Sequence, residues 1–241
     1  MCIEKTDTIT KQTYQSFQQL KEKGYVLFLN TGSSFHAFGE FVHTLPFDGF
    51  VCGCGTYIRY HDQVLLEAKL PDDKIQEVLD CLEKYRIEPY FEGHRGLFCN
   101  QITSAYMKGQ IESIVKRGLA FRDTQDPTFH FIKLSVHYPD EDARVHFESE
   151  MEKYFDCIKW NEDETEVVLK GYSKGKAMTF WLQYFNIDHQ NDYAFGDSNN
   201  DEEMQLAAGN SILIGKQLRN LVDKVTFVSK DAAHDGVTYA L

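Results

Sequence analysis

The sequence predicts an α/β protein in which a doubly wound parallel sheet carries an inserted α+β module. Short apolar runs alternate with helical patterns over the first 60 residues, and the same rhythm resumes from about residue 170. Between these two segments, strand and helix patterns are grouped differently. Alternation of strand and helix is typical of a parallel sheet with helices on both faces. We therefore expect a core domain split into residues 1–60 and 170–241, and an α+β domain at 61–169.

The first core segment begins with a helix and continues with strands. Thr10 fits an N-cap and Gly24 a C-terminal stop for a helix over 11–23. The continuous apolar run 25–29 predicts a buried parallel strand, and a further short strand starts at Phe50.

The remaining elements follow from apolar periodicity. The inserted module is expected to open with a hairpin over 57–65 that leads out of the sheet. Its further elements are helices over 72–85, 104–117 and 140–155, and strands over 129–136 and 166–169. The second core segment contains helices over 175–185 and 202–208, and strands over 193–195, 211–214 and 225–228.

Composition excludes some classes of partner. The formal net charge is −12, so the surface repels nucleic-acid phosphates and anionic membranes. No apolar run approaches the roughly 20 residues of a membrane helix, and the first seven residues lack the apolar core of a signal peptide. We expect a cytoplasmic protein with no nucleic-acid or membrane partner, and the oligomeric state stays open.

The cysteines favour the same compartment. Six are scattered through apolar patterns, which is typical of reduced, buried thiols. The segment Cys52-Gly53-Cys54-Gly55 is compatible with a metal site, but a single C-x-C pair favours a structural loop.

The loop at 196–204 carries the strongest chemical signal. It follows an apolar strand, at the place where open α/β sheets bind ligands. Hard oxygen ligands suit Mg²⁺ and a phosphate. We expect Asp197 to approach the metal, Asn200 to contact a substrate oxygen, and Asp201 to orient the site. An acidic turn that caps a helix is the alternative.

Two other elements supply phosphate-binding groups. Thr31-Gly32 follows the strand at 25–29 and offers a hydroxyl and a backbone amide to a phosphate oxygen. Lys174 stands at a helix start, where the helix dipole disfavours a cation unless it faces an anion. A simple turn and an exposed lysine are the alternatives, and Lys176 is expected to face solvent.

These motifs resemble those of the haloacid-dehalogenase-like (HAD) phosphatases, in the Cof-type branch with a class IIB cap. Gly196 to Met204 matches Gly-Asp-x-x-Asn-Asp-x-x-Met, and Ser173 to Ala177 matches Ser-Lys-Gly-x-Ala. Thr31-Gly32 matches the phosphate-binding turn, and His234 to Val237 resembles the closing segment. The resemblance implies a Rossmann-like core with an inserted cap, a Mg²⁺ cofactor and a hydrolase activity.

The sequence departs from that family at three places. Ser33 replaces the usual Arg, and Cys54 stands where Asn is usual. The motif Asp-x-Asp-Gly-Thr, which supplies the nucleophile and the general acid/base, does not occur. Asp7 is interpreted as a turn residue. The resemblance therefore implies a truncated N-terminus, from an incorrect start codon or an altered gene, and a missing central strand between the Thr31 and Asp197 strands.

Two functions remain open from the sequence. The first is a Mg²⁺-dependent phosphatase of a small phosphorylated metabolite, for example a sugar phosphate, impaired because the nucleophile is absent. Lys174 and Asp201 would be catalytic, Thr31, Gly32 and Asn200 would bind phosphate, and Asp197 would bind the metal. The alternative is a non-catalytic phosphate-binding, metal-binding or regulatory protein; a phosphotransferase or phosphomutase is a lesser one. Four cap residues are candidates for substrate contact or are merely solvated: Tyr90, Glu92, His94 and Arg95.

Overall fold

The computed structural model describes residues 9–38, 40–159, 161, 163–216 and 218–241. Its contacts divide the chain into two compact units. Unit 1 comprises Met1–Gly32, Glu40–Gln63 and Ser173–Leu241, and unit 2 comprises Ser33–Gly39 and Val64–Tyr172. The short segment 33–39 therefore belongs to a different unit from the residues on either side of it.

Seven strands form two sheets where the sequence predicts one. The first sheet has the order β1-β2-β3-β4, with β1 parallel and β3 antiparallel to β2. Its strands are β1 (Phe28–Asn30), β2 (Gly49–Cys52), β3 (Tyr57–Tyr60) and β4 (Gln63–Glu67). The second sheet is wholly parallel. Its strands are β11 (Tyr193–Gly196), β12 (Asn210–Ile214) and β13 (Phe227–Ser229).

The edge strands β1 and β11 lie near each other in unit 1. The ring centroids of Tyr25, before β1, and Tyr193, in β11, are 6.2 Å apart. In the part of the chain that the structure describes, neither strand pairs on its second edge. The expected absence of a central strand between the Thr31 and Asp197 strands stays a prediction. Asp7, interpreted as a turn residue, lies outside the described residues.

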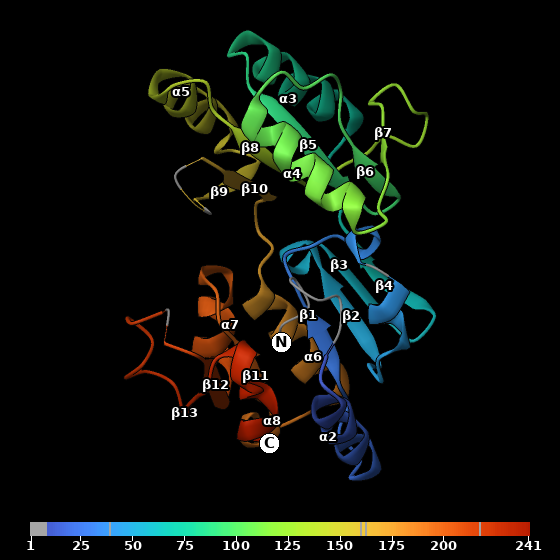
Figure 1. The fold of residues 1–241 in the computed structure, drawn as a ribbon, viewed down its shortest axis with the longest axis vertical. Coiled ribbons are helices and arrows are strands. Elements are labelled where there is room, and N and C mark those ends of the chain that lie inside the picture. The colour runs from blue at the N-terminus through green and yellow to red at the C-terminus, as the bar shows by residue number, and fades with distance from the viewer. Residues whose placement is uncertain (1–8, 39, 160, 162, 217) are drawn as a thin grey trace. The chain divides into compact units, whose positions relative to one another are not determined.

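Helices of unit 1 flank these sheets (Figure 1). They are α2 (Lys11–Glu22), α6 (Lys174–Phe185), α7 (Glu202–Ala207) and α8 (Gly236–Ala240). Thr10 caps α2 as expected, because its side chain accepts the Thr13 amide at 3.1 Å. On α6, Trp181 stacks on Phe28 of β1 with ring centroids 4.1 Å apart. This aromatic contact packs α6 against the first sheet.

Unit 2 contains a six-stranded sheet with helices on both faces. The strand order is β7-β6-β5-β8-β10-β9, and all neighbours are antiparallel except β6 and β7. The strands are β5 (Glu88–Gly93), β6 (Gly96–Phe98), β7 (Phe121–Arg122), β8 (Lys133–His137), β9 (Phe155–Lys159) and β10 (Thr165–Leu169). The helices are α3 (Asp72–Lys84), α4 (Ala105–Lys116) and α5 (Glu141–Met151).

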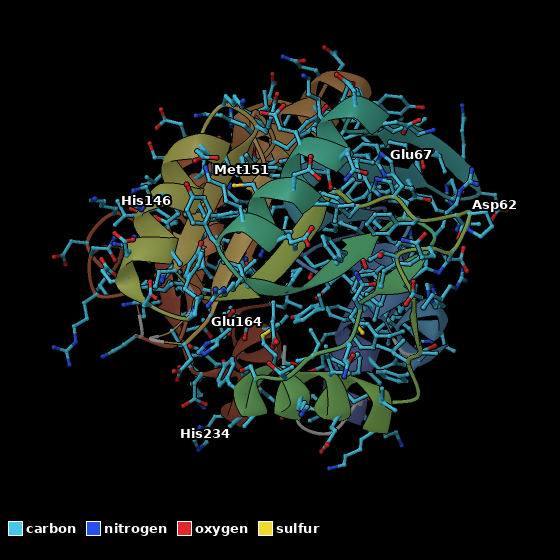
Figure 2. The ribbon with its side chains drawn as sticks, turned by 90° about the horizontal axis from the view of Figure 1, so that it is seen from above. Asp62, Glu67, His146, Met151, Glu164 and His234 are labelled. Carbon is cyan, nitrogen blue, oxygen red and sulfur yellow. The ribbon has the colours of Figure 1, made fainter. Side chains whose placement is uncertain are left out.

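The two faces of this sheet differ in chemistry. Side chains alternate along a strand, so Phe91 on β5 and Leu134 on β8 share one face. That face packs with α3 and α5 into an apolar core, which includes Met151 (Figure 2). On the opposite face, α4 packs on Tyr90 and Leu97. The same face carries the buried ionisable residues Glu92 and Lys133.

The α/β fold class is confirmed, and several element boundaries are corrected. The strand predicted at 25–29 is β1, which begins only at Phe28, because Tyr25 and Val26 are exposed. The helix predicted at 140–155 ends at Met151, and Phe155 instead starts β9, where it pairs with β10. Strands β5, β6, β7 and β9 were not predicted. The hairpin at 57–65 extends the first sheet and does not lead out of it.

The structure also bears on the cysteines and on the search for a membrane helix. Cys81, Cys99 and Cys157 are free thiols, and Cys52 and Cys54 are buried. Residues 53–55 form a short 3-10 turn, which agrees with a structural loop. No helix in the described segments is long and apolar enough to cross a membrane.

Candidate active site

Lys174 is buried at the first position of α6. The Ser173 hydroxyl accepts the Lys176 amide at 3.0 Å and so caps the helix. The Lys174 ammonium donates to Asp201 Oδ1 at 2.6 Å and to Asn200 Oδ1 at 2.7 Å. Only 6% of Lys174 is exposed. The anion that a lysine at this position requires is therefore supplied by the loop after β11.

Asp201 holds this loop in shape. Its Oδ2 accepts the backbone amides of Asp197 and Ser198, each at 3.0 Å, and the Ser198 hydroxyl at 2.9 Å. Burial alone would raise the pKa of Asp201, but the Lys174 charge and these hydrogen bonds outweigh it and lower the pKa below 3.8. Asp201 is thus an ionised carboxylate with both oxygens engaged. Its position suits the orientation of the loop better than direct contact with a substrate.

Gly196 allows the loop to fold this closely. A Cβ at this position would lie 2.6 Å from Asp201 Cβ and 2.9 Å from its Oδ2. Gly175 serves a similar purpose on α6, since a Cβ there would lie 2.9 Å from the backbone of Glu203 on α7. Both glycines of the sequence motifs are explained by the approach of α6 to the loop and to α7.

Asp197 differs from Asp201 because it is exposed. Its carboxylate makes no hydrogen bond or ion pair with another described residue. A single such carboxylate fits Mg²⁺, which is usually held by one or two carboxylates together with waters and substrate phosphate oxygens. The described residues contain no group of three or more His, Cys, Asp or Glu side chains that could hold a metal. Asp197 is therefore the carboxylate of this loop that is open to a metal.

The Thr31-Gly32 turn is tied to its surroundings by the backbone. The Thr31 amide donates to Val51 O at 2.9 Å, and its carbonyl accepts the Cys54 amide at 3.1 Å. One residue further, Gly55 has a φ of +95°, and a Cβ there would lie 2.5 Å from Ser173 O. This close approach places the 53–55 turn between the Thr31 turn and the start of α6.

Asn30 joins the same elements and was missed by the sequence analysis. Its Nδ2 donates to the Lys174 carbonyl at 3.0 Å and to Met204 Sδ at 3.3 Å. Ser198 was also missed, although a Ser three residues before Asp201 is the pattern of a capping box, which the loop forms. Asn30 carries no comparable local signal, because its partners come from distant parts of the sequence.

Unit 1 therefore brings together the sequence-predicted site residues. Lys174, Asn200 and Asp201 touch directly, and Asp197 lies on the same loop. Thr31 follows Asn30, which bonds to Lys174. An ammonium has three N–H donors, and two of those on Lys174 are used by Asn200 and Asp201. One donor is left for a further acceptor.

The candidate cap residues belong to unit 2. Tyr90, Glu92 and His94 are buried, and Arg95 is exposed. The alternative that all four are solvated is therefore wrong for three of them. Tyr90 and Tyr106 donate to Glu164 at 3.3 and 3.1 Å (Figure 2 labels Glu164), so Tyr90 has a partner inside unit 2.

Comparisons with known proteins place the chain in a family. The family described as haloacid dehalogenase-like hydrolase matches residues 2–241. "Putative phosphatase YkrA" of Bacillus subtilis is 23% identical over 236 residues, which cover 97% of this chain and 90% of that protein. Pyridoxal phosphate phosphatase YbhA of Escherichia coli is 24% identical over 251 residues. The match covers 95% of this chain and 90% of that protein.

Solved structures agree on the fold. The structure of the HAD subclass IIB sugar phosphatase BT4131 superposes with a TM-score of 0.80 at 17% identity, covering 98% of this chain and 92% of that one. The match of the family over almost the whole chain and the shared fold lead to one conclusion: this chain belongs to the haloacid dehalogenase-like hydrolases and has the fold of their subclass IIB phosphatases.

Proposed function

We propose that this protein is by lineage a Mg²⁺-dependent phosphatase of a small phosphorylated metabolite, for example a sugar phosphate, in the cytoplasm. The observation that carries the proposal is the buried Lys174–Asp201 pair beside the exposed carboxylate of Asp197. Relatives named for phosphatase activity, one of them toward pyridoxal phosphate, support the reaction class.

Each residue has a defined task in this proposal. Lys174 donates its remaining N–H to a phosphate oxygen and offsets negative charge on the phosphoryl group. Asn200 and the Thr31-Gly32 turn contact other phosphate oxygens. Asp201 keeps Lys174 and the 196–201 loop in place. Asp197 would hold Mg²⁺, which when bound neutralises charge on the phosphate.

We further propose that the 241-residue chain turns over slowly or not at all. Its residues include no Asp-x-Asp-Gly-Thr motif. Without that carboxylate nucleophile, transfer of the phosphoryl group through a covalent enzyme intermediate has no acceptor. Ordered phosphate-binding groups would then bind a phosphate without cleaving its ester.

The alternative is a non-catalytic phosphate-binding or regulatory protein on the same scaffold. It is favoured by the same missing motif and by the intact phosphate-facing groups. The two candidates differ in whether a chain preceded by an Asp-x-Asp-Gly-Thr segment exists in the cell. Reading the DNA upstream of Met1 tests this: an in-frame motif supports the phosphatase, and stop codons support the binding protein.

Binding and turnover are tested on the same purified chain. Titration calorimetry with inorganic phosphate should give Mg²⁺-dependent binding, which Asp197→Ala abolishes. Lys174→Met should weaken the binding, while Lys176→Met, an exposed lysine two residues away, should not. Hydrolysis of para-nitrophenyl phosphate should stay near the uncatalysed rate. Fast hydrolysis that Asp197→Ala removes would disprove the proposed impairment, and absence of phosphate binding would disprove both functions.

A further inference from the structure

The segment immediately after the phosphate-binding turn is part of unit 2. The chain leaves unit 1 at Gly32 and enters unit 2 at Ser33. It returns to unit 1 at Glu40. The described residues of this segment contribute no strand to the unit 2 sheet, so other contacts hold it there. Two kinds of contact do so.

The first contact is a buried hydrogen bond. The Ser34 backbone amide donates to Glu92 Oε2 at 2.9 Å. Ser34 is fully buried and Glu92 is 5% exposed. A hydrogen bond to an ionised carboxylate is about twice as strong as one between neutral groups, and water does not compete for it here. This bond is the polar anchor of the segment.

The second contact is apolar. Residues Phe35–Ala37 form a 3-10 turn, and Ala37 packs against the cluster that Tyr90, Leu97, Met107 and Ile114 form under α4. This packing keeps the Ser34–Glu92 bond away from solvent. The segment is therefore fastened to unit 2 at its start and in its middle.

Glu92 is itself fixed inside unit 2. Its Oε1 lies 3.2 Å from Lys133 Nζ, and Lys133 also binds Glu166 on β10. One oxygen of Glu92 thus serves Lys133 and the other serves Ser34. A glutamine at this position has a single oxygen acceptor and cannot serve both. Glu166 is a natural control because it pairs with the same lysine, whereas the Ser34 amide donates to Glu92.

We propose that Glu92 is a positioning residue for the phosphate-binding turn, acting through the Ser34 amide. A single residue, Ser33, separates Gly32 of the turn from this anchor. Any displacement of Ser34 is transmitted through so short a link to Gly32 and Thr31. The inference rests on the proposed phosphate-binding function of that turn.

The test compares Glu92→Gln with Glu166→Gln. Glu92→Gln should speed hydrogen exchange at the amides of Ser34 and Thr31, and should weaken binding of inorganic phosphate with Mg²⁺ by about fivefold or more, the usual size of coupling between sites. Glu166→Gln should leave the exchange at Thr31 and the phosphate affinity unchanged. Amide exchange is read by NMR and affinity by titration calorimetry.

A second pair of variants changes Ser34 and leaves the acid in place; only one of the two removes the N–H donor. Ser34 has φ −70°, close to the value that proline requires, so Ser34→Pro deletes the N–H with little backbone change. Ser34→Ala keeps the N–H and deletes a hydroxyl that makes no hydrogen bond within the described part of the chain. Ser34→Pro should reproduce the effect of Glu92→Gln on Thr31, and Ser34→Ala should not.

The outcomes separate this inference from the proposed function. Equal effects of Glu92→Gln and Glu166→Gln on Thr31 exchange and phosphate affinity would overturn it. Loss of a negative charge in unit 2 would then explain the effects without the Ser34 hydrogen bond. Faster exchange at Ser34 with no change at Thr31 would also overturn it. If the wild-type chain binds no phosphate, the proposed function fails, and the exchange at Thr31 alone decides whether Glu92 positions the turn.

Discussion

A buried lysine occurs in each unit, and the two are held in different ways. Lys174 begins α6 and pairs with one carboxylate, that of Asp201. Lys133 lies within β8, between the carboxylates of Glu92 on β5 and Glu166 on β10. In unit 1 the charges balance, whereas the three residues in unit 2 carry one surplus negative charge.

The carboxylates differ in how completely they are satisfied. Both oxygens of Asp201 are engaged, and Oδ2 alone accepts three hydrogen bonds. Glu166 Oε2 is buried and has no hydrogen-bond partner among the residues that the structure describes. Backbone amides stabilise Asp201 whether or not Lys174 is present. In unit 2, Glu166 depends much more on its lysine, whereas Glu92 also accepts the Ser34 amide.

The largest effect is expected from Lys133→Met. It leaves two buried carboxylates without their cation, and removing one partner of a buried ion pair typically costs about 3–5 kcal/mol. We expect a loss in the free energy of unfolding near the top of that range, about 5 kcal/mol. Urea unfolding followed by circular dichroism measures it. If Lys133→Met lowered the free energy of unfolding by less than Lys174→Met does, the comparison of the two buried lysines would be wrong.

Lys174→Met should be less damaging. Asp201 keeps the amides of Asp197 and Ser198 and the Ser198 hydroxyl, so we expect a loss of about 3 kcal/mol, at the lower end for a broken buried pair. The same urea experiment measures it. Lys176→Met is the matched control on α6, and as an exposed substitution it should change stability by no more than about 0.5 kcal/mol.

Acidification should weaken unit 2 before unit 1. Burial lowers the pKa of His94 from 6.5 to about 4. Between these values the unfolded chain binds a proton that the folded chain does not, so stability falls as the pH falls. The loss approaches about 2–3 kcal/mol by pH 4, since a tenfold difference in proton affinity corresponds to about 1.36 kcal/mol. His94→Gln should remove this part of the pH dependence of urea unfolding.

Asp201 responds only at lower pH. Its folded pKa lies below the ordinary 3.8, so its contribution is present above that value and is lost as the pH falls through the folded pKa. In a Trp160→Phe background, the fluorescence of Trp181, which lies in unit 1, follows this unit separately. Loss of the unit 1 signal above pH 5, before any change assigned to His94, would reverse the expected order.

The smallest effects on stability are expected from replacing glycine by alanine at two positions, where the effects have opposite signs. Gly24 has φ +87° after α2, and Gly109 lies inside α4; a Cβ at either position meets no atom within 4 Å. Gly24→Ala forces alanine into the left-handed region and should cost about 1 kcal/mol. Gly109→Ala should stabilise the helix by roughly 0.5–1 kcal/mol. The midpoints of urea unfolding measure both changes in stability. If both variants shifted the midpoint in the same direction, backbone conformation would not explain the effects.

The sequence by itself determined the fold class and named Lys174, Asn200 and Asp201, which the structure brings into contact. Lys174 and Asp201 lie in contiguous motifs whose spacing is set by a strand, a turn and a helix start, and such local patterns are readable along the chain. The helices α2, α3 and α6 were predicted for the same reason, because their sequence patterns lie within each segment, with a cap recognised at Thr10 for α2.

Only the tertiary structure decided how distant strands align. Lys133 meets Glu92 because β5 and β8 pair in one register, and a shift by one residue would turn one of them to the apolar face. Residues 33–39 likewise join unit 2 through distant partners, among them Glu92, which is 58 residues from Ser34. Register and long-range hydrogen bonds join residues that carry no shared local pattern, so the sequence could name the phosphate-binding turn but not the acid that anchors the chain beside it.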